Sequence, residues 1–496
     1  MILVRPAIFS LLFTILLSLS VGSLPLKAQD SSAVWHDCHV KKITEKAECA
    51  TISVPLDYDN PSDGRTVDVF VAKISSTGTE IKDDPFIILP GGPGQAASDS
   101  GSLLNAGFNK VRQGREILLI DHRGVGNSNQ LNCARVDDMA VTQEGILQYI
   151  QTCLDDLEHD PKYFGVDAAQ RDYLEVINAL GYDQVNLYGV SYGTRTASWL
   201  MREAPTLIRS AILDGVLPPE MQLFEQSPKG AEQALQALFT ACGVDAACNQ
   251  AFPNLATRFA DWVTALRDAP MRFTVRNPVT FEMESVNFDY VSFVQAVRGI
   301  LYSTGRSASL PHALDQLFDG NAGPFSALSA AGAALTDTMA LGSTLSILCG
   351  DEIYGADEAA IAKAGATSFT DDSYYQFWKS ACQVWPYTKG REINKEPLNS
   401  DVPTLLLSGA VDPVTPYQNG DAWTETLSNV RHLIVPATGH NTAYVGCMPD
   451  ILAEFVDTLD SASLKAECLQ TTSRHAFVTG VMGPSRSAPE SIGDSQ

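Results

Sequence analysis

The sequence has few basic side chains. Lysine and arginine together number 34, against 58 aspartates and glutamates, so the formal net charge at pH 7 is −24. A surface for nucleic acid or anionic lipids would have to form against this overall field. The shortage of positive charge therefore predicts a protein with no nucleic-acid partner.

Long hydrophobic runs are also scarce, and the one that exists lies at the N-terminus. Arg5 precedes an apolar stretch of about 15 residues from Ala7 to Val21, and Pro25-Leu26-Lys27-Ala28 follows it. This stretch is short for a membrane span, and its order of charge, apolar run and small residue is typical of a secretory signal. We predict that residues 1–28 are a signal peptide and that the mature protein is exported, either periplasmic or secreted, with no membrane span. An uncleaved anchor is the alternative.

Zinc-binding motifs are missing. The chain has neither C-x-x-C nor H-E-x-x-H, which are spacings that bring zinc ligands together. Ten cysteines, an even number, favour five disulfides in an exported chain. The simplest arrangement joins neighbours along the chain: Cys38 with Cys49, Cys133 with Cys153, Cys242 with Cys248, Cys349 with Cys382, and Cys447 with Cys468. We therefore predict a protein that needs no metal and no cofactor.

Patterns of buried strands alternate with helical patterns between residues 50 and 215. Residues 66–74 alternate between apolar and polar side chains, as a half-buried strand does. Nearly continuous apolar runs, typical of buried parallel strands, occupy residues 86–89, 117–120, 185–188 and 211–213. Helical patterns such as residues 168–180 separate them. This alternation predicts an α/β fold with a doubly wound, mostly parallel sheet.

The pattern changes near residue 218. From there to about residue 400 the chain favours helices and loops, for example at 230–242 and 252–267, and strand patterns return only at 404–407 and 432–435. We predict a core interrupted by one large, mainly helical lid insertion. The predicted divisions are a first core part at 29–217, the lid at 218–400, a second core part at 401–470, and a flexible tail without periodicity at 471–496.

The residues around Ser191 carry the first sign of chemistry. Gly189-Val190-Ser191-Tyr192-Gly193 is a G-x-S-x-G motif that lies between a strand pattern and a helical pattern. A tight strand-to-helix turn exposes the serine hydroxyl at the sheet edge, and its crowded backbone accepts only small residues two positions to either side. We predict that Ser191 is the nucleophile of an α/β-hydrolase.

A serine nucleophile needs a base, and the base needs a carboxylate to orient it. Of the eight histidines, His440 alone directly follows the last predicted strand, in a loop that can reach over Ser191. Asp412 follows the preceding strand, and Asp214, at the end of an earlier strand, is its rival. Both choices keep the order serine, acid, histidine of α/β-hydrolases. We favour Asp412 as the orienting acid.

Two backbone N–H donors must face the developing oxyanion. Tyr192, the residue after the nucleophile, supplies one. The loop after the strand at 86–89 reads Pro90-Gly91-Gly92-Pro93-Gly94, and its prolines have no N–H to donate. The three glycines remain as candidates, and we choose Gly92 as the second donor.

Five short motifs follow one another along the chain: Gly91-Gly92-Pro93-Gly94, Asp121-His122-Arg123-Gly124-Val125-Gly126-Asn127-Ser128, Gly189-Val190-Ser191-Tyr192-Gly193, Ser408-Gly409-Ala410-Val411-Asp412-Pro413-Val414-Thr415-Pro416 and Gly439-His440. Their order resembles that of the prolyl-iminopeptidase and tripeptidyl-aminopeptidase family of α/β-hydrolases. The tripeptidyl-aminopeptidase branch is the more similar one, because residues 54–58 and 447–468 resemble its N-terminal strand and C-terminal module. Two features depart from the prolyl iminopeptidases: Pro90 replaces their usual histidine, and the insertion is longer.

The resemblance and the candidate triad imply an exported serine exopeptidase that removes one or a few residues from free peptide N-termini. An esterase or amide hydrolase of small molecules could use the same triad, because the fold and the triad fix the reaction type and the lid fixes the substrate. A non-catalytic binding protein on the same scaffold is a remote third possibility. The expected partner is therefore a peptide or small-molecule substrate.

An exopeptidase must recognise a free α-ammonium group, for which a carboxylate is the natural counter-charge. Asp351 and Glu352 follow Cys349 in the lid, and the predicted disulfide to Cys382 would hold them over the mouth of the active site. Members of the similar family use acidic residues of the insertion in this way. We predict that both acids bind substrate, with Glu352 contributing more. A pair of solvated loop acids is the alternative.

Overall fold

The computed structural model describes residues 33–133, 143–277, 281–333, 338–388, 395–480 and 483. The predicted signal peptide at 1–28 lies outside the described residues. None of the helices in the described ranges has both the length and the hydropathy needed to cross a bilayer.

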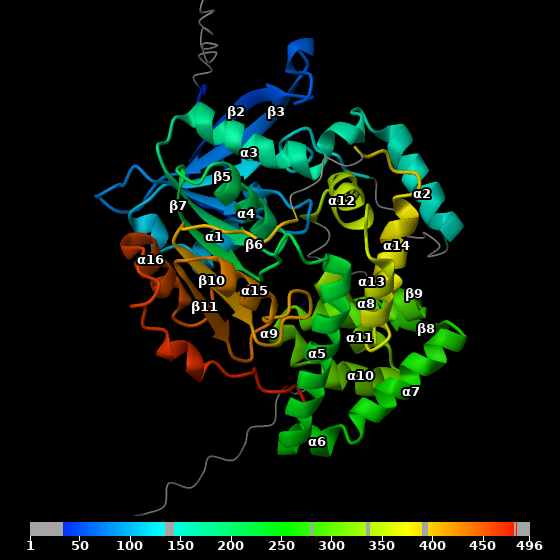
Figure 1. The fold of residues 1–496 in the computed structure, drawn as a ribbon. Coiled ribbons are helices and arrows are strands. Elements are labelled where there is room, and N and C mark those ends of the chain that lie inside the picture. Colours follow the sequence, from blue (N-terminus) through cyan, green and yellow to red (C-terminus); the bar gives the residue numbers. More distant parts are fainter. Residues whose placement is uncertain are drawn as a thin grey trace, which may run out of the picture. The chain divides into compact units, whose positions relative to one another are not determined.

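A nine-stranded sheet forms the centre of the core (Figure 1). Its strands, in spatial order, are β1 (His36–Cys38), β2 (Ala47–Pro55), β3 (Thr66–Ile74), β5 (Ile117–Asp121), β4 (Phe86–Leu89), β6 (Val185–Val190), β7 (Ile208–Asp214), β10 (Thr404–Gly409) and β11 (Val430–Val435). The pairs from β1 to β5 are antiparallel, and those from β5 to β11 are parallel. The predicted fold class, a mostly parallel α/β sheet, is confirmed.

Helices cover both faces of this sheet, which explains the continuous apolar runs of its central strands. Every residue of β4, β5, β6 and β10 is buried. On one face the sheet packs with α3 (Val166–Leu180), α4 (Gly193–Glu203) and α15 (Asn419–Thr426). On the other face it packs with α1 (Gly101–Gly107) and α16 (Met448–Thr458).

The insertion after β7 is mainly helical, as predicted, but it also contains a hairpin of β8 (Met271–Arg276) and β9 (Met283–Phe288). Most of its helices lie together to the lower right of the sheet in Figure 1. They are α5 (Leu223–Val244), α6 (Ala246–Ala251), α7 (Leu255–Asp268), α8 (Tyr290–Leu301), α9 (Thr304–Ser307), α10 (Leu310–Phe318), α11 (Gly323–Ala333), α12 (Leu341–Leu348), α13 (Glu358–Gly365) and α14 (Ser373–Ala381). Helix α2 (Gln143–Asp156) precedes α3 and packs against α14.

The lid has a hydrophobic core of its own, separate from the two core clusters of the sheet. Leu238, Phe259, Phe293 and Phe325 from four helices meet in it. A further cluster joins the lid to the sheet, since it combines Tyr192 next to the nucleophile with side chains of α12 and α14. The lid is thus anchored directly beside the predicted nucleophile.

The prediction of a flexible tail from residue 471 is wrong for its first part. Phe477 is buried in the core of the lid, and the Val478 N–H donates to the Ala308 carbonyl at 3.0 Å. An apolar side chain that finds a hydrophobic cluster fixes a segment even where the sequence shows no periodicity. Residues 481–482 and 484–496 of the predicted tail lie outside the described residues.

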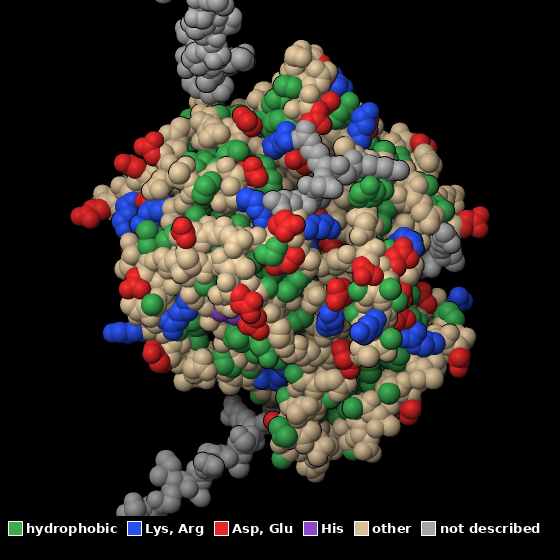
Figure 2. All heavy atoms as spheres, in the orientation of Figure 1, with side chains coloured by type: hydrophobic (Ala, Val, Ile, Leu, Met, Phe, Trp, Pro, Cys, Tyr) green, Lys and Arg blue, Asp and Glu red, His purple; other side chains and the backbone are tan. Residues whose placement is uncertain are grey.

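All five predicted disulfides are present in the structure. All ten cysteines fall within the described residues and none is free. Disulfides in this number are typical of proteins that fold in an oxidising compartment outside the cytosol. On the face shown in Figure 2, acidic and basic side chains are interspersed, and no single basic patch forms there.

Candidate active site

Ser191 lies in the turn between β6 and α4, at the carboxyl edge of the sheet. Its backbone is left-handed, with φ of 56°, which is a costly conformation for a residue with a side chain. The Ser191 N–H donates to the Asp214 carbonyl of the neighbouring strand β7 at 2.8 Å. This is the strained turn that the G-x-S-x-G pattern predicts, and Ser191 is half-buried in it.

The two glycines of the motif are required by close backbone contacts. A Cβ atom on Gly193 would lie 2.1 Å from the Leu89 carbonyl oxygen, and one on Gly189 would lie 2.6 Å from the Gly193 carbonyl oxygen. Both distances are far below normal van der Waals contact. The helix α4 can therefore approach the sheet closely enough to present Ser191 only because these residues are glycines.

His440 and Asp412 are brought together by the loops after β11 and β10. The His440 Nδ1 lies 2.7 Å from the Asp412 Oδ2, so that Nε2 is the ring nitrogen left for the serine. The Asp412 carboxylate is buried and accepts three further bonds, from the Val414 N–H, the Thr415 N–H and the Thr415 hydroxyl. These donors fix the carboxylate in the orientation that holds the imidazole.

The contact shifts the pKa of both partners. Burial alone would raise the pKa of Asp412, but the charge and hydrogen bond of His440 outweigh it and hold that pKa below its ordinary value. Burial alone would lower the pKa of His440, but the Asp412 carboxylate outweighs it, so the pKa of His440 lies above its ordinary value. The pair is thus set up to stabilise an imidazolium.

Ser191 and His440 meet the same end of β7. The Ser191 N–H is bonded to Asp214, and a Cβ atom on the next residue, Gly215, would lie 2.9 Å from Cε1 of His440. The imidazole therefore packs on the Gly215 backbone beside the nucleophile. Among the described residues the Ser191 hydroxyl has no hydrogen-bond partner. In hydrolases without substrate, the hydrogen bond between serine and histidine is commonly long and shortens only when substrate binds.

Asp214, the alternative acid, binds the backbone of the loop that carries His440 and not its imidazole. Its carboxylate accepts the Thr442 N–H at 2.8 Å, the Ala443 N–H at 3.0 Å, the Thr442 hydroxyl at 3.1 Å and the Tyr188 hydroxyl at 2.9 Å. It thereby anchors the backbone just after His440, whereas Asp412 contacts the imidazole itself. The geometry favours Asp412 as the orienting acid.

The glycine-rich loop after β4 lies directly against the nucleophile. A Cβ atom on Gly91 would lie 2.8 Å from the Cβ of Ser191, and Gly92 has φ of 108°, which favours glycine. Within the described part of the chain, neither the Gly92 N–H nor the Tyr192 N–H has an acceptor. Both amides are free for an oxyanion, and their role stays a prediction.

The lid reaches the triad through Tyr302, at the C-terminal end of α8. The Tyr302 carbonyl accepts the His440 N–H at 3.0 Å, and the two rings meet edge to face with centroids 5.3 Å apart. A cavity of about 150 Å³ lies beside this contact, and its lining includes Tyr302, His440, Tyr444 and His475. No sequence pattern pointed to Tyr302, because the contact joins segments nearly 140 residues apart.

Asp351 and Glu352 lie in a π-helical turn, Cys349–Ile353, that faces the helix after the nucleophile. The Arg195 Nη1 of α4 contacts the Asp351 Oδ2 at 2.8 Å and also donates to Glu352. The Tyr192 hydroxyl donates to the same Asp351 oxygen. Sequence reasoning missed Arg195, although a cation four residues after the serine was the available signal.

Asp351 and Glu352 are both buried. Each is only 1% exposed, so the alternative of solvated loop acids is wrong. Both Glu352 oxygens are occupied, by Arg195 and by the Leu223 N–H at 2.9 Å, and burial raises the pKa of Glu352. The Asp351 Oδ1 is buried without a hydrogen-bond partner. Lys395 contacts the backbone carbonyl of Asp351 at 2.9 Å.

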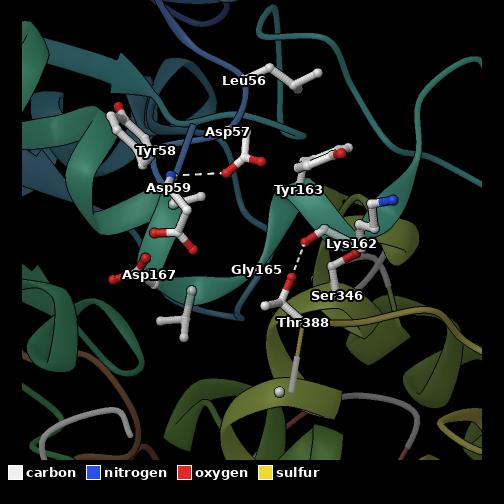
Figure 3. A pocket seen from close by; sticks show the side chains of 13 residues that line it. Leu56, Asp57, Tyr58, Asp59, Lys162, Tyr163, Gly165, Asp167, Ser346 and Thr388 are labelled. Carbon is white, nitrogen blue, oxygen red and sulfur yellow. Dashed lines mark hydrogen bonds between the residues drawn. The ribbon is translucent and has the colours of Figure 1, made fainter. Parts of the chain in front are cut away.

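A second cavity, shown in Figure 3, contains none of the predicted site residues. Two hydrogen bonds join residues of its lining: the Thr388 hydroxyl donates to the Lys162 carbonyl at 2.6 Å, and the Asp59 N–H donates to the Asp57 carboxylate at 2.9 Å.

Comparison with known proteins agrees with this geometry. Residues 84–240 match the family model described as alpha/beta hydrolase fold, and residues 368–468 match the model described as TAP-like protein. The chain is an α/β-hydrolase with a TAP-like C-terminal module. The family resemblance inferred from the motifs is thereby confirmed.

The relatives of this TAP-like hydrolase carry several activities in their names. The serine protease Hip1 of Mycobacterium tuberculosis is 23% identical over 425 residues, covering 78% of this chain and 81% of that protein. A tripeptidyl aminopeptidase of Streptomyces lividans is 24% identical over 424 residues, covering 77% and 76%. A carboxylesterase B of Mycobacterium tuberculosis is 26% identical over 427 residues, covering 78% and 80%. The chain is a serine hydrolase of this family.

Proposed function

We propose that this hydrolase is an exported serine exopeptidase that cleaves peptide bonds near free N-termini, as an aminopeptidase or a tripeptidyl aminopeptidase. Ser191 is the acyl nucleophile, His440 the general base and acid, and Asp412 the orienting carboxylate. The amides of Gly92 and Tyr192 form the oxyanion hole. The hydrogen-bonded His440–Asp412 pair beside the Ser191 turn supports these roles.

The reaction needs no group from outside the chain except water. The Ser191 Oγ attacks the peptide carbonyl while the His440 Nε2 accepts its proton, and the oxyanion accepts bonds from the two amides. The C–N bond then breaks as the imidazolium returns the proton to the leaving amine. Water, deprotonated by His440, hydrolyses the acyl-enzyme, releases the carboxylic acid and restores the serine.

One observation carries the exopeptidase assignment: the buried carboxylate of Asp351 next to the nucleophile loop. Where the lid meets α4, two carboxylates face the buried guanidinium of Arg195, Lys395 donates to the Asp351 backbone carbonyl, and the Asp351 Oδ1 lacks a hydrogen-bond partner. An unpaired buried carboxylate oxygen is costly unless a cation or donor completes it. The α-ammonium group of a peptide has the charge and the N–H donors that this oxygen lacks.

The same observation reverses the expected ranking of the two acids. Sequence reasoning gave Glu352 the larger share, but both of its oxygens are engaged in holding Arg195 and the start of α5. Asp351 therefore recognises the ammonium group, and Glu352 positions Arg195. Loss of Glu352 should damage peptide and ester hydrolysis alike.

The test compares free and acetylated N-termini. Wild-type protein should cleave a free-amine peptide well and its N-acetyl form poorly, as mass spectrometry of the products would show. Asp351→Asn should lower kcat/KM for the free-amine peptide about 10- to 150-fold, the equivalent of a charge-assisted hydrogen bond of about 1.5–3 kcal/mol, and leave a small ester nearly unchanged.

Asp319→Asn is the matched control, because Asp319 lies on the lid in an exposed ion pair with Arg258 and should affect neither substrate. Cleavage that ignores acetylation would remove the exopeptidase assignment. Turnover of esters without turnover of any peptide would favour the esterase alternative, which the similarity to a carboxylesterase also supports. Absence of both activities would favour a binding protein.

Export is part of the proposal. The predicted signal at 1–28 and the five disulfides support it together, since both are typical of proteins that leave the cytosol. N-terminal sequencing of the protein recovered outside the cytosol should begin after Ala28. A start at Met1 would contradict cleavage.

A further inference from the structure

Arg298 lies on the lid helix α8, one turn before Tyr302. Its side chain is buried, with 7% of its surface exposed. The guanidinium makes two long hydrogen bonds of 3.3 Å, from Nη1 to the Gln295 side-chain oxygen and from Nη2 to the Tyr302 hydroxyl. Its Nε is buried with no acceptor. Both groups that accept its hydrogen bonds are neutral, and Asp412 of the proposed triad acts on its positive charge only from beyond ion-pair distance.

Four other arginines are buried in the described part of the chain, and each has a carboxylate partner. They pair as Arg112 with Glu45, Arg115 with Asp84 and Asp457, Arg123 with Asp172, and Arg195 with Asp351 and Glu352. Arg298 has none within the described residues. A buried charge without a counter-charge is costly, and buried charges are normally paired.

The aromatic rings around Arg298 compensate for only part of this cost. The guanidinium carbon lies 4.7 Å from the centroid of the Tyr374 ring and 5.6 Å from that of the Tyr302 ring. Aromatic faces attract a cation but neither accept five N–H bonds nor neutralise its charge. The Nε donor in particular stays open.

Arg298 is close to the triad but does not belong to it. Tyr302, which accepts its hydrogen bond, also holds the His440 backbone and ring. The Asp412 carboxylate, which acts electrostatically on Arg298, already receives four donors, from Val414, Thr415 and His440. No carboxylate of the described residues pairs directly with Arg298, so its open N–H donors are left for an anionic group of the substrate.

We infer that Arg298 is a specificity residue that binds a carboxylate of the substrate on the lid side of the triad. The inference rests on the proposed function for the reaction that Ser191 carries out, whereas the unpaired charge of Arg298 is observed independently of it. A planar guanidinium with open donors suits a carboxylate best. Two sources have this chemistry: the C-terminal carboxylate of a short peptide, and an acidic side chain close to the scissile bond.

The experiment uses matched substrate pairs with the mature protein. One pair is a short peptide as free acid and as C-terminal amide, and a second pair has Glu or Gln beside the scissile bond. A third pair is a phenyl ester of succinic acid, with its free carboxylate, and phenyl butyrate. In at least one pair wild-type protein should prefer the carboxylate about 10-fold or more in kcat/KM. The pair that shows the preference identifies the source.

Arg298→Gln should reduce that ratio to nearly one by weakening only the carboxylate member, and Arg298→Lys should keep part of it. Arg272→Gln, at an exposed position of β8, should keep the whole ratio. Both substrates of a pair are measured with the same preparation of each variant. A partial loss of folded protein therefore lowers both rates equally and leaves their ratio unchanged. A wild-type ratio near one in all three pairs, or a ratio that Arg298→Gln leaves unchanged, would overturn the inference. The ester pair tests it even if no peptide is cleaved.

Discussion

The polar groups at the carboxyl edge of the sheet and those on the lid next to it are positioned by different parts of the fold. Ser191, Asp412 and His440 each follow a strand directly, so the parallel order of the strands brings them to one edge. Asp351 and Arg298 come from the insertion and meet the site through contacts with Tyr192 and Tyr302. In the proposed function, the sheet edge supplies the reaction and the lid selects the substrate.

The largest effect should come from the sheet edge. Ser191→Ala and His440→Ala should each lower kcat by about four orders of magnitude or more, on peptides and esters alike, because nucleophile and base act as a unit. For the same reason the double variant should be scarcely worse than either single one. Steady-state kinetics on both substrate types would check this, and additive losses would contradict the assignment.

Asp412 and Asp214, two buried aspartates near the ends of neighbouring strands, should differ in their effect on catalysis. Asp412→Asn should lower kcat about 10³- to 10⁴-fold, because the amide no longer holds the imidazole in its working tautomer. Asp214→Asn should lower kcat much less. It should cost about 1–3 kcal/mol in the free energy of unfolding, since at least one of the donors from Thr442, Ala443 and Tyr188 loses its acceptor. The reverse ranking of activity losses would transfer the orienting role to Asp214.

Removing a disulfide tests how firmly the lid holds its acids. Replacing Cys349 and Cys382 by serine opens a 33-residue loop and should cost about 2–4 kcal/mol in the free energy of unfolding. It should also lower kcat/KM for free-amine peptides more than for small esters, because the turn with Asp351 loosens. The same change at Cys242 and Cys248 is the control, since that loop spans only six residues and lies away from the triad. Equal losses on both substrates would show that the turn does not select the peptide.

The smallest effect is a shift in pH dependence. The base must be neutral to accept the serine proton, and Asp412 raises the pKa of His440 above its ordinary value of 6.5. The acid limb of the kcat/KM profile should therefore lie above pH 6.5 in wild type. The residual activity of Asp412→Asn should show this limb at lower pH, because the carboxylate that favours the imidazolium is gone. An unchanged limb would mean that another group controls it.

The sequence predicted the sheet edge far better than the lid. Strand ends, two crowded glycines and chain order suffice to place Ser191, Asp412 and His440, because these signals are local. Pairing neighbouring cysteines also succeeded for all five disulfides. The helical insertion was predicted, but its β8–β9 hairpin was not.

The groups that sequence reasoning missed depend on contacts between distant segments. Arg195 pairs with Asp351 across 156 residues, and Tyr302 meets His440 only because α8 packs on the last catalytic loop. Phe477 falls within the predicted flexible tail because the segment from residue 471 shows no periodicity, yet its side chain is buried in the lid core. Burial of this kind is a property of the packed molecule and leaves no pattern along the chain.

Locating the nucleophile tests the proposed chemistry most directly. Mature wild-type protein treated with a fluorophosphonate should gain one adduct by intact mass spectrometry, and peptide mapping should place it on Ser191. Ser191→Ala should gain none, His440→Ala should label far more slowly, and Asp351→Asn should label at nearly the wild-type rate, since the lid acid selects substrate without activating the serine. An adduct on another residue, or no adduct on the folded wild-type protein, would contradict the central claim that the sheet edge carries the reaction.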